Sequence, residues 1–158
     1  MTFDEAFHEL LGHEGEYVDH PRDPGGATRW GVTERVAREY GYASDMKVFP
    51  VETAKAIYRK QYWDAVRAEE LPAPLRYPTF DAAVNSGVAQ AVKWLQRTVG
   101  AVDDGKIGPE TLRVANGSDA EKAARQMTGR RLRFMTELAT WPAFGRGWSK
   151  RIAAVLEK

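Results

Sequence analysis

The chain has 158 residues, the length of one ordinary domain, and folding should bury about two-thirds of the surface of the unfolded chain. Hydrophobic residues make up 43% and charged residues 28%, a composition that excludes a disordered protein. The absence of cysteine excludes disulfides and thiolate chemistry. There is no run of ~18 apolar residues and no signal-peptide pattern, so we expect synthesis in a reducing cytoplasm without stable membrane insertion.

Charge is distributed unevenly, although the formal net charge is only +1. Residues 121–158 contain nine Lys and Arg against three Glu, so this segment carries +6 and residues 1–120 carry −5. Such a basic surface attracts an anionic polymer, either cell wall or nucleic acid. The Arg125 to Arg133 cluster is the nucleic-acid candidate, but near-neutral total charge and the missing recognition motif argue against that partner.

The N-terminal residues predict a helix followed by a turn-rich segment. Thr2 and Glu5 form a T-x-x-E capping box before a helical apolar pattern, which should end near residues 12–15. Residues 16–32 are rich in proline and glycine and predict a loop or at most one small β-hairpin. Within it, residues 27–32 are expected to form a short strand.

Helix signals recur along the rest of the chain. Helices are expected over 33–40 and 50–64, between 80 and 100 with a break at Gly87, from Pro109, from a Ser118–Glu121 capping box to Trp141-Pro142, and around Trp148. The inward-facing positions of the Ser118 helix are expected to be Ala123, Met127, Phe134 and Leu138. The proline-rich segment 71–78 is typical of a hinge between two lobes.

Glu14 is the candidate general acid for glycoside hydrolysis, which needs a protonated carboxylic acid beside the leaving oxygen. It lies between Gly12 and Gly15 at an expected helix end, with apolar neighbours whose burial favours the protonated form. Position alone does not separate this role from that of a solvated surface charge.

A long, ordered pattern around Glu14 resembles the N-terminal signature of glycoside hydrolase family 108. The family pattern is E-G-G-Y, a D-P-G-G-x-T turn and G-I-T. The corresponding residues here are Glu14-Gly15, Tyr17, Asp23-Pro24-Gly25-Gly26, Thr28 and Gly31-Val32-Thr33. Glu16 replaces the second glycine. The similarity continues through residues 57–58, 62–63, 80–87 and 95–96, and residues 103–112 resemble an element of the family's C-terminal, predicted peptidoglycan-binding half.

The resemblance implies a mainly α (α+β, lysozyme-like) fold. The chain would be a single two-lobed domain over residues 1–158, with a catalytic lobe 1–70 and a C-terminal helical lobe 76–158. It implies a monomeric N-acetylmuramidase of the phage endolysin type, with Glu14 as general acid and inversion of configuration. The bond cleaved would be the β-1,4 bond between N-acetylmuramic acid and N-acetylglucosamine. A phage or prophage source and holin-assisted release to the periplasm follow from the same resemblance.

Asp23 and Thr28 are the candidates that hold the attacking water. Related phage lysozymes place an Asp nine positions after the acid and a Thr six positions further. Asp23 matches the first interval, but position 29 is Arg, so Thr28 and Thr33 both stay open for the second role. Asp-Pro-Gly is also ordinary turn chemistry, which leaves a structural role for Asp23 equally open.

Tyr17, Trp30, Thr33 and Asn85 are the candidate sugar-binding residues, because aromatic rings stack on pyranoses and amides bond hydroxyl and acetamido groups. Alternatively, Tyr17 and Trp30 pack the hairpin onto the first helix and Asn85 caps the break before Gly87.

No cofactor or metal is expected, because the three histidines at positions 8, 13 and 20 lack zinc-ligand spacing. Two other functions remain open. One is a lytic transglycosylase, and the other is a non-catalytic cell-wall-binding module that uses residues 80–115.

Overall fold

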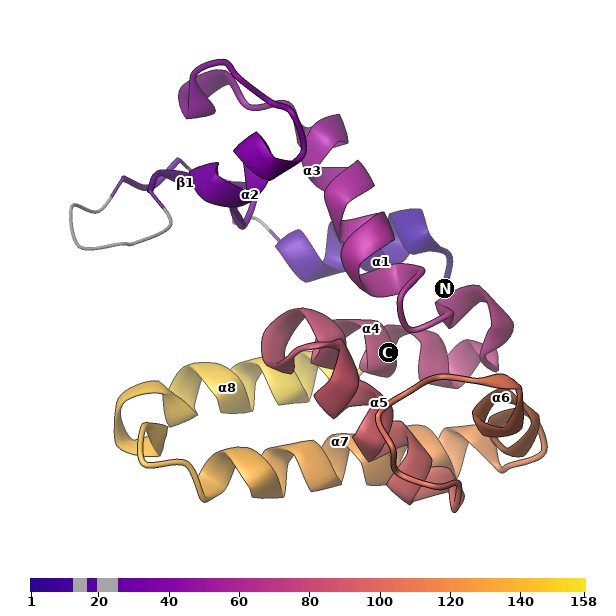
Figure 1. Ribbon diagram of the computed structural model, residues 1–158. Coiled ribbons are helices and arrows are strands. Elements are labelled where there is room, and N and C mark those ends of the chain that lie inside the picture. Colours follow the sequence, from indigo (N-terminus) through magenta and orange to yellow (C-terminus); the bar gives the residue numbers. More distant parts are fainter. Residues whose placement is uncertain (13–16, 20–25) are drawn as a thin grey trace. The chain divides into compact units, whose positions relative to one another are not determined.

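The computed structural model describes residues 1–12, 17–19 and 26–158 (Figure 1). They form two compact units, Thr2–Gln61 and Tyr62–Lys158, and Met1 belongs to the second. Helices dominate both units, and the sheet within the described residues is one antiparallel pair of two-residue strands. The predicted mainly α fold with one small hairpin is confirmed. Among the described helices, none is both long and apolar enough to cross a membrane.

The unit Thr2–Gln61 contains the predicted N-terminal helices and the hairpin. Its elements are α1 (Phe3–Leu11), β1 (Thr28–Arg29), β2 (Val32–Thr33), α2 (Glu34–Glu39), the 3₁₀ helix η1 (Met46–Val48), α3 (Val51–Tyr58) and the first residues of the π-helical turn η2 (Arg59–Trp63). The capping box is present, because the Thr2 hydroxyl accepts from the Glu5 amide at 3.3 Å and the Glu5 carboxylate accepts from the Thr2 amide at 2.7 Å. Hydrogen bonding from the Thr2 amide, followed by that from the Thr2 side chain, lowers the pKa of Glu5, and the capping box marks where α1 begins.

Helix α1 is fixed against α3 by aromatic packing. Phe3, Ala6 and Phe7 are the buried residues of α1, as its helical periodicity predicts. The Phe7 ring meets the ring of Tyr58 edge-on, with centroids 5.4 Å apart. The segment that carries Glu14, three residues after the end of α1 at Leu11, therefore follows a packed helix in the sequence.

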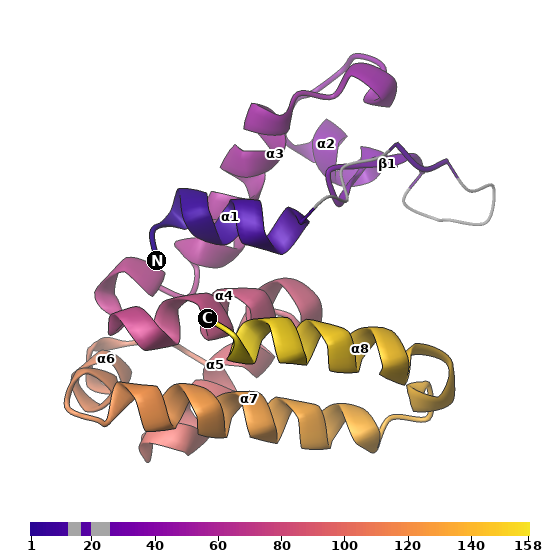
Figure 2. The ribbon, with the colours of Figure 1, turned by 180° about the vertical axis from the view of Figure 1, so that it is seen from behind.

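The unit Tyr62–Lys158 is helical throughout its regular elements. They are the 3₁₀ helix η3 (Ala68–Glu70), α4 (Ala73–Ser86), α5 (Val88–Val99), α6 (Pro109–Asn116), α7 (Ala120–Thr136) and α8 (Trp141–Leu156). Helices α7 and α8 lie side by side and antiparallel in both views (Figures 1 and 2). The predicted break at Gly87, the end at Gly100 and the start at Pro109 are confirmed.

The prediction of a hinge at residues 71–78 is wrong, because helix α4 begins inside this segment at Ala73. Pro74 lies in the first turn, where its missing amide hydrogen costs nothing. Pro78 lies inside the helix and is buried together with Leu75 and Tyr77. The apolar surface that these residues bury offsets the hydrogen bond lost at Pro78.

The predicted ends of α7 also need correction. Asp119 is the N-cap, with its carboxylate accepting from the Lys122 amide at 3.1 Å. The Ser118 hydroxyl instead donates to the Ala115 carbonyl at 2.7 Å, where it helps end α6. Trp141 and Pro142 start α8 and do not end α7, since proline favours a first helical turn. Of the expected inward positions, Phe134 is 39% exposed, and its neighbour Met135 is buried instead.

A buried ionic cluster joins three helices of this unit. Asp81 of α4 is 1% exposed, and its carboxylate accepts from Nη1 of Arg131 on α7, which is also 1% exposed. The other carboxylate oxygen accepts from Nε of Arg151 on α8 at 2.8 Å. Nε and Nη2 of Arg131 are buried, and no described residue forms a hydrogen bond with either nitrogen. One carboxylate thus compensates two guanidinium groups.

Asp81→Asn should destabilise the protein strongly, because it leaves two cations without their counter-charge. Removing one partner of a buried ion pair costs about 3–5 kcal/mol. Glu110→Gln is the matched control, since the Glu110–Arg113 pair has 67% and 71% exposed side chains. Such an exposed pair contributes at most about 1 kcal/mol. Urea unfolding of both variants measures the difference, and equal losses would contradict a central role for Asp81.

Candidate active site around the hairpin

The predicted site residues fall into three groups. Glu14 and Asp23 lie outside the described residues, as do His13 and His20. Tyr17, Thr28, Trp30 and Thr33 belong to the unit Thr2–Gln61, and Asn85 belongs to the unit Tyr62–Lys158. The geometry of the site is therefore built from the hairpin and its surroundings.

The hairpin turns at Trp30 and Gly31, so the strand predicted over residues 27–32 is in fact two short strands. Both turn residues have positive φ, 53° for Trp30 and 71° for Gly31. Positive φ at both central positions defines a type I′ turn, whose twist matches that of paired strands. Gly31 is required for space as well, because a Cβ there would collide with the Tyr58 hydroxyl. The turn is thus seated on α3.

The register places the two candidate threonines opposite each other. Thr28 pairs with Thr33 and Arg29 pairs with Val32. The Thr28 amide and carbonyl both bond to Val18, at 2.7 and 2.8 Å, so Thr28 and Thr33 form a non-hydrogen-bonded pair with neighbouring side chains. Because side chains alternate, Val32, which is buried, lies on the other face. Both hydroxyls therefore share the more accessible face of the hairpin.

The two hydroxyls differ in what they already bind. The Thr33 hydroxyl accepts from the Val36 amide at 3.4 Å as the N-cap of α2. No described residue forms a hydrogen bond with the Thr28 hydroxyl. Among the described residues, the Thr28 hydroxyl thus has no partner, whereas one acceptor site of the Thr33 hydroxyl is used by the helix cap.

Trp30 is held on two sides. Its indole nitrogen donates to the Phe49 carbonyl at 3.0 Å, and the Arg29 guanidinium lies 5.5 Å from its ring centroid. Positive φ is unfavourable for a residue with a Cβ, by about 1–2 kcal/mol. The hydrogen bond and the cation–π contact offset that strain. This arrangement favours the packing role over sugar stacking.

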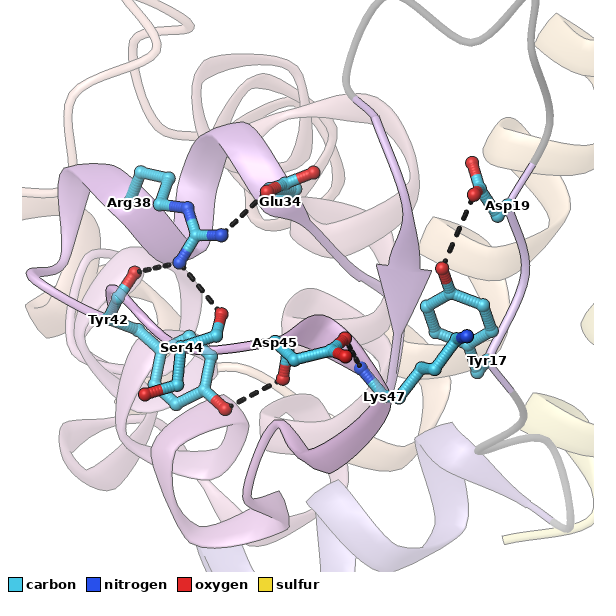
Figure 3. A network of polar contacts seen from close by, with 8 residues as sticks. All are labelled: Tyr17, Asp19, Glu34, Arg38, Tyr42, Ser44, Asp45 and Lys47. Atoms are coloured by element: carbon cyan, nitrogen blue, oxygen red, sulfur yellow. Dashed lines mark hydrogen bonds and ion pairs between the residues drawn. The ribbon is translucent and has the colours of Figure 1, made fainter.

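Tyr17 lies at the edge of the polar network drawn in Figure 3. Its hydroxyl donates to Asp19 Oδ2 at 3.3 Å, and Lys47 Nζ lies 5.8 Å from its ring centroid. Desolvation, followed by the negative charge of Asp19 and the hydrogen bond to it, raises the pKa of Tyr17. The phenol thus keeps its proton and acts as a donor. Lys47 restricts access to the ring.

The same network contains carboxylates that the sequence did not single out. Glu34 and Asp45 also raise the pKa of Tyr17, so both charges lie near its phenol. Arg38 orders this region, donating to Glu34 at 2.6 Å and to the carbonyls of Tyr42 and Ser44 at 2.8 Å each (Figure 3). Glu34 and Asp45 read in sequence as ordinary helix-start residues, so only tertiary packing reveals them.

Asn85 is exposed on the last turn of α4. The amide of Gly87 bonds to the Ala83 carbonyl at 2.9 Å, so the helix end is closed by backbone. No described residue forms a hydrogen bond with the Asn85 side chain, which removes the capping alternative within the described structure.

Comparison with known families agrees with these features. Residues 7–87 match the family model described as Glycosyl hydrolase 108, and residues 90–153 match the model described as Predicted Peptidoglycan domain. A glycoside hydrolase segment joined to a peptidoglycan domain defines a glycoside hydrolase that acts on peptidoglycan. The chain belongs to the glycosyl hydrolase 108 family.

A solved structure supports the assignment over nearly the whole chain. SagA of Brucella abortus is 37% identical, with a TM-score of 0.85, and the match covers 98% of this chain and 91% of SagA. No curated protein matches the chain.

Trp30→Phe should destabilise the protein by about 1 kcal/mol, because it removes the indole hydrogen bond to Phe49 while keeping an aromatic ring. If Trp30 has a packing role, KM for peptidoglycan stays within about twofold of the parent value. Thermal unfolding and turbidity kinetics measure the two effects, with Tyr40→Phe as a surface control. A large rise in KM at unchanged stability would instead assign Trp30 to sugar binding.

Proposed function

We propose that the chain is an N-acetylmuramidase that cleaves the β-1,4 bond between N-acetylmuramic acid and N-acetylglucosamine. Glu14 protonates the glycosidic oxygen as general acid. The observation that carries this proposal is the family match over residues 7–87, which includes Glu14 and the whole hairpin. The end of α1 and the hairpin thus bracket the segment that carries the acid.

The second half of the reaction is a water attack on the opposite face of the sugar. In an inverting enzyme, a group distant from the acid holds this water. We assign that role to Asp23, which accepts the proton of the attacking water, together with Thr28, which orients it. Within the described residues the Thr28 hydroxyl has no hydrogen-bond partner, whereas the Thr33 oxygen accepts from the Val36 amide, and this difference favours Thr28. Tyr17, as a protonated donor, and Asn85, as an exposed amide, are proposed to bind sugar groups.

The wider assignments are proposals on the same basis. Residues 1–70 act as the catalytic lobe and residues 76–158 hold the polymer, within one monomeric domain. The family resemblance supports a phage or prophage endolysin that reaches the periplasm with the help of a holin. A lytic transglycosylase would also use one Glu, but it leaves anhydro sugar ends in place of reducing ends.

Glu14→Gln should abolish lysis of outer-membrane-permeabilised Gram-negative cells, because the glutamine amide has no acidic proton to transfer to the glycosidic oxygen. Turbidity loss measures lysis, and mass spectrometry of the released ends identifies the chemistry, with reducing N-acetylmuramic acid ends expected. Glu39→Gln is the matched control, since Glu39 has a 57% exposed side chain paired with Arg35 at 3.6 Å.

Three results would contradict the proposal. Undiminished lysis by a folded Glu14→Gln variant removes Glu14 from the mechanism. Anhydro ends from the parent protein show a transglycosylase. Binding to cell walls without any lysis by the parent shows a non-catalytic module.

Substitutions of Thr28 and Thr33 should have different effects on the catalytic rate and on the stability of the protein. Thr28→Ala should lower kcat by about 10- to 100-fold with little change in stability, because it removes a group that orients water. Thr33→Ala should cost about 1 kcal/mol of folding free energy as a lost N-cap, and Thr33→Ser should restore it. Turnover on purified sacculi and urea unfolding provide the two measurements, and the reverse pattern would move the water-positioning role to Thr33.

A further inference from the structure

A small basic hollow lies between α5 and α7. It has a volume of about 190 Å³ and is lined by Trp94, Arg97, Arg130, Arg133, Phe134 and Glu137. Every lining residue belongs to the segment 90–153 that matches the Predicted Peptidoglycan domain. The hollow lies within one unit and contains none of the residues assigned to catalysis above.

The aromatic residues give the hollow a firm apolar wall. Trp94 is 3% exposed, and its ring meets that of Phe134 edge-on at 5.4 Å and 68°. Phe134 is 39% exposed, an unusual value for a phenylalanine packed on a buried tryptophan. A ligand that covers this ring gains apolar contact without displacing the packing beneath it.

The cations of the hollow have unused bonding capacity. No described residue forms an ion pair with the side chains of Arg130 or Arg133. Arg97 uses Nε to bond Asp103 at 2.5 Å, which leaves its two terminal nitrogens. Glu137 is the carboxylate among the lining residues and Asp103 pairs with Arg97, so Arg130 and Arg133 supply the positive charge that is left for a ligand. Guanidinium forks bind carboxylates in a bidentate geometry and are weakly hydrated, which suits a shallow site.

We propose that this hollow binds the carboxylates of the peptide stems of peptidoglycan, with Phe134 contacting their alanine methyl groups. The inference rests on peptidoglycan being the substrate, and it names the part of the polymer that the C-terminal unit holds. Peptide stems combine free carboxylates with small apolar side chains, and this is the combination that the lining offers. The neutral sugar hydroxyls of the glycan do not require three arginines.

The test measures binding of the Glu14→Gln variant to peptidoglycan, because this variant does not hydrolyse the ligand. The further substitutions are made in the same variant. Two substrates are compared by sedimentation: intact sacculi, and sacculi stripped of their free stem carboxylates by carbodiimide coupling to ammonia, which keeps the stems and their cross-links. Arg130→Gln with Arg133→Gln should weaken binding to intact sacculi by about tenfold or more, because charge-assisted hydrogen bonds are lost. Binding to stripped sacculi should be weaker at the outset and should change less than twofold.

The control removes the same charge from elsewhere in this unit. Arg125→Gln with Arg146→Gln takes two exposed arginines from α7 and α8 outside the hollow. Equal weakening by both double variants would overturn the proposal, since it would show non-specific attraction. Equal binding of the Glu14→Gln variant to intact and stripped sacculi would also overturn it, by showing that the stem carboxylates are not recognised.

A soluble probe checks the site directly and separates it from the catalytic proposal. Muramyl tetrapeptide should shift the NMR signals of Arg130, Arg133 and Phe134, and no shift at saturating probe would contradict the assignment. The muramidase proposal has a separate test. It would be contradicted if the parent protein, with Glu14 intact, released no reducing ends from the same sacculi.

Discussion

The C-terminal unit is organised around one buried carboxylate. Asp81 bonds Arg131 and Arg151 and so ties α4 to both α7 and α8. Burying these charges costs several kcal/mol per ion, so the cluster adds little net stability over an apolar core. It does restrict the ways in which the helices can pack, because another register would leave charges unpaired. Asp81 lies within residues 80–87, one of the segments that resembles the family. Its two ion pairs are a structural reason for this part of the resemblance.

The hairpin depends on a different constraint, the conformation of two turn residues. A type I′ turn is tight, and its register puts Thr28 and Thr33 on one face. The strained residue is Trp30, and its hydrogen bond to Phe49 joins the turn to the segment that begins α3. Strain at a candidate active site is stabilised by the surrounding packing here, so the hairpin can hold a reacting group in a fixed place.

The sequence predicted the elements that have local causes. The Thr2 capping box, the break at Gly87 and the helix start at Pro109 follow from caps and turns a few residues long. The α4 start was not predicted, because prolines usually mark linkers and only tertiary burial of Leu75 and Tyr77 explains this helix. The acidic surroundings of Tyr17 were missed for the same reason. They arise from contacts between residues far apart in sequence, for which one sequence contains no signal.

The arginines of residues 121–158 have two different roles in the structure. Arg131 and Arg151 neutralise Asp81 and contribute packing specificity, so the field at the surface is weaker than a count of charges suggests. Screening further weakens long-range attraction at physiological salt. Recognition of a ligand therefore depends on the local arrangement of the arginines. Helix α7 contains arginines with both roles, one in the core and others at the surface. Arg131 points into the core, whereas its neighbours Arg130 and Arg133 line an open hollow beside an exposed aromatic ring. One helix thus supplies an internal counter-charge and an external binding surface, because helical periodicity separates adjacent arginines onto different faces.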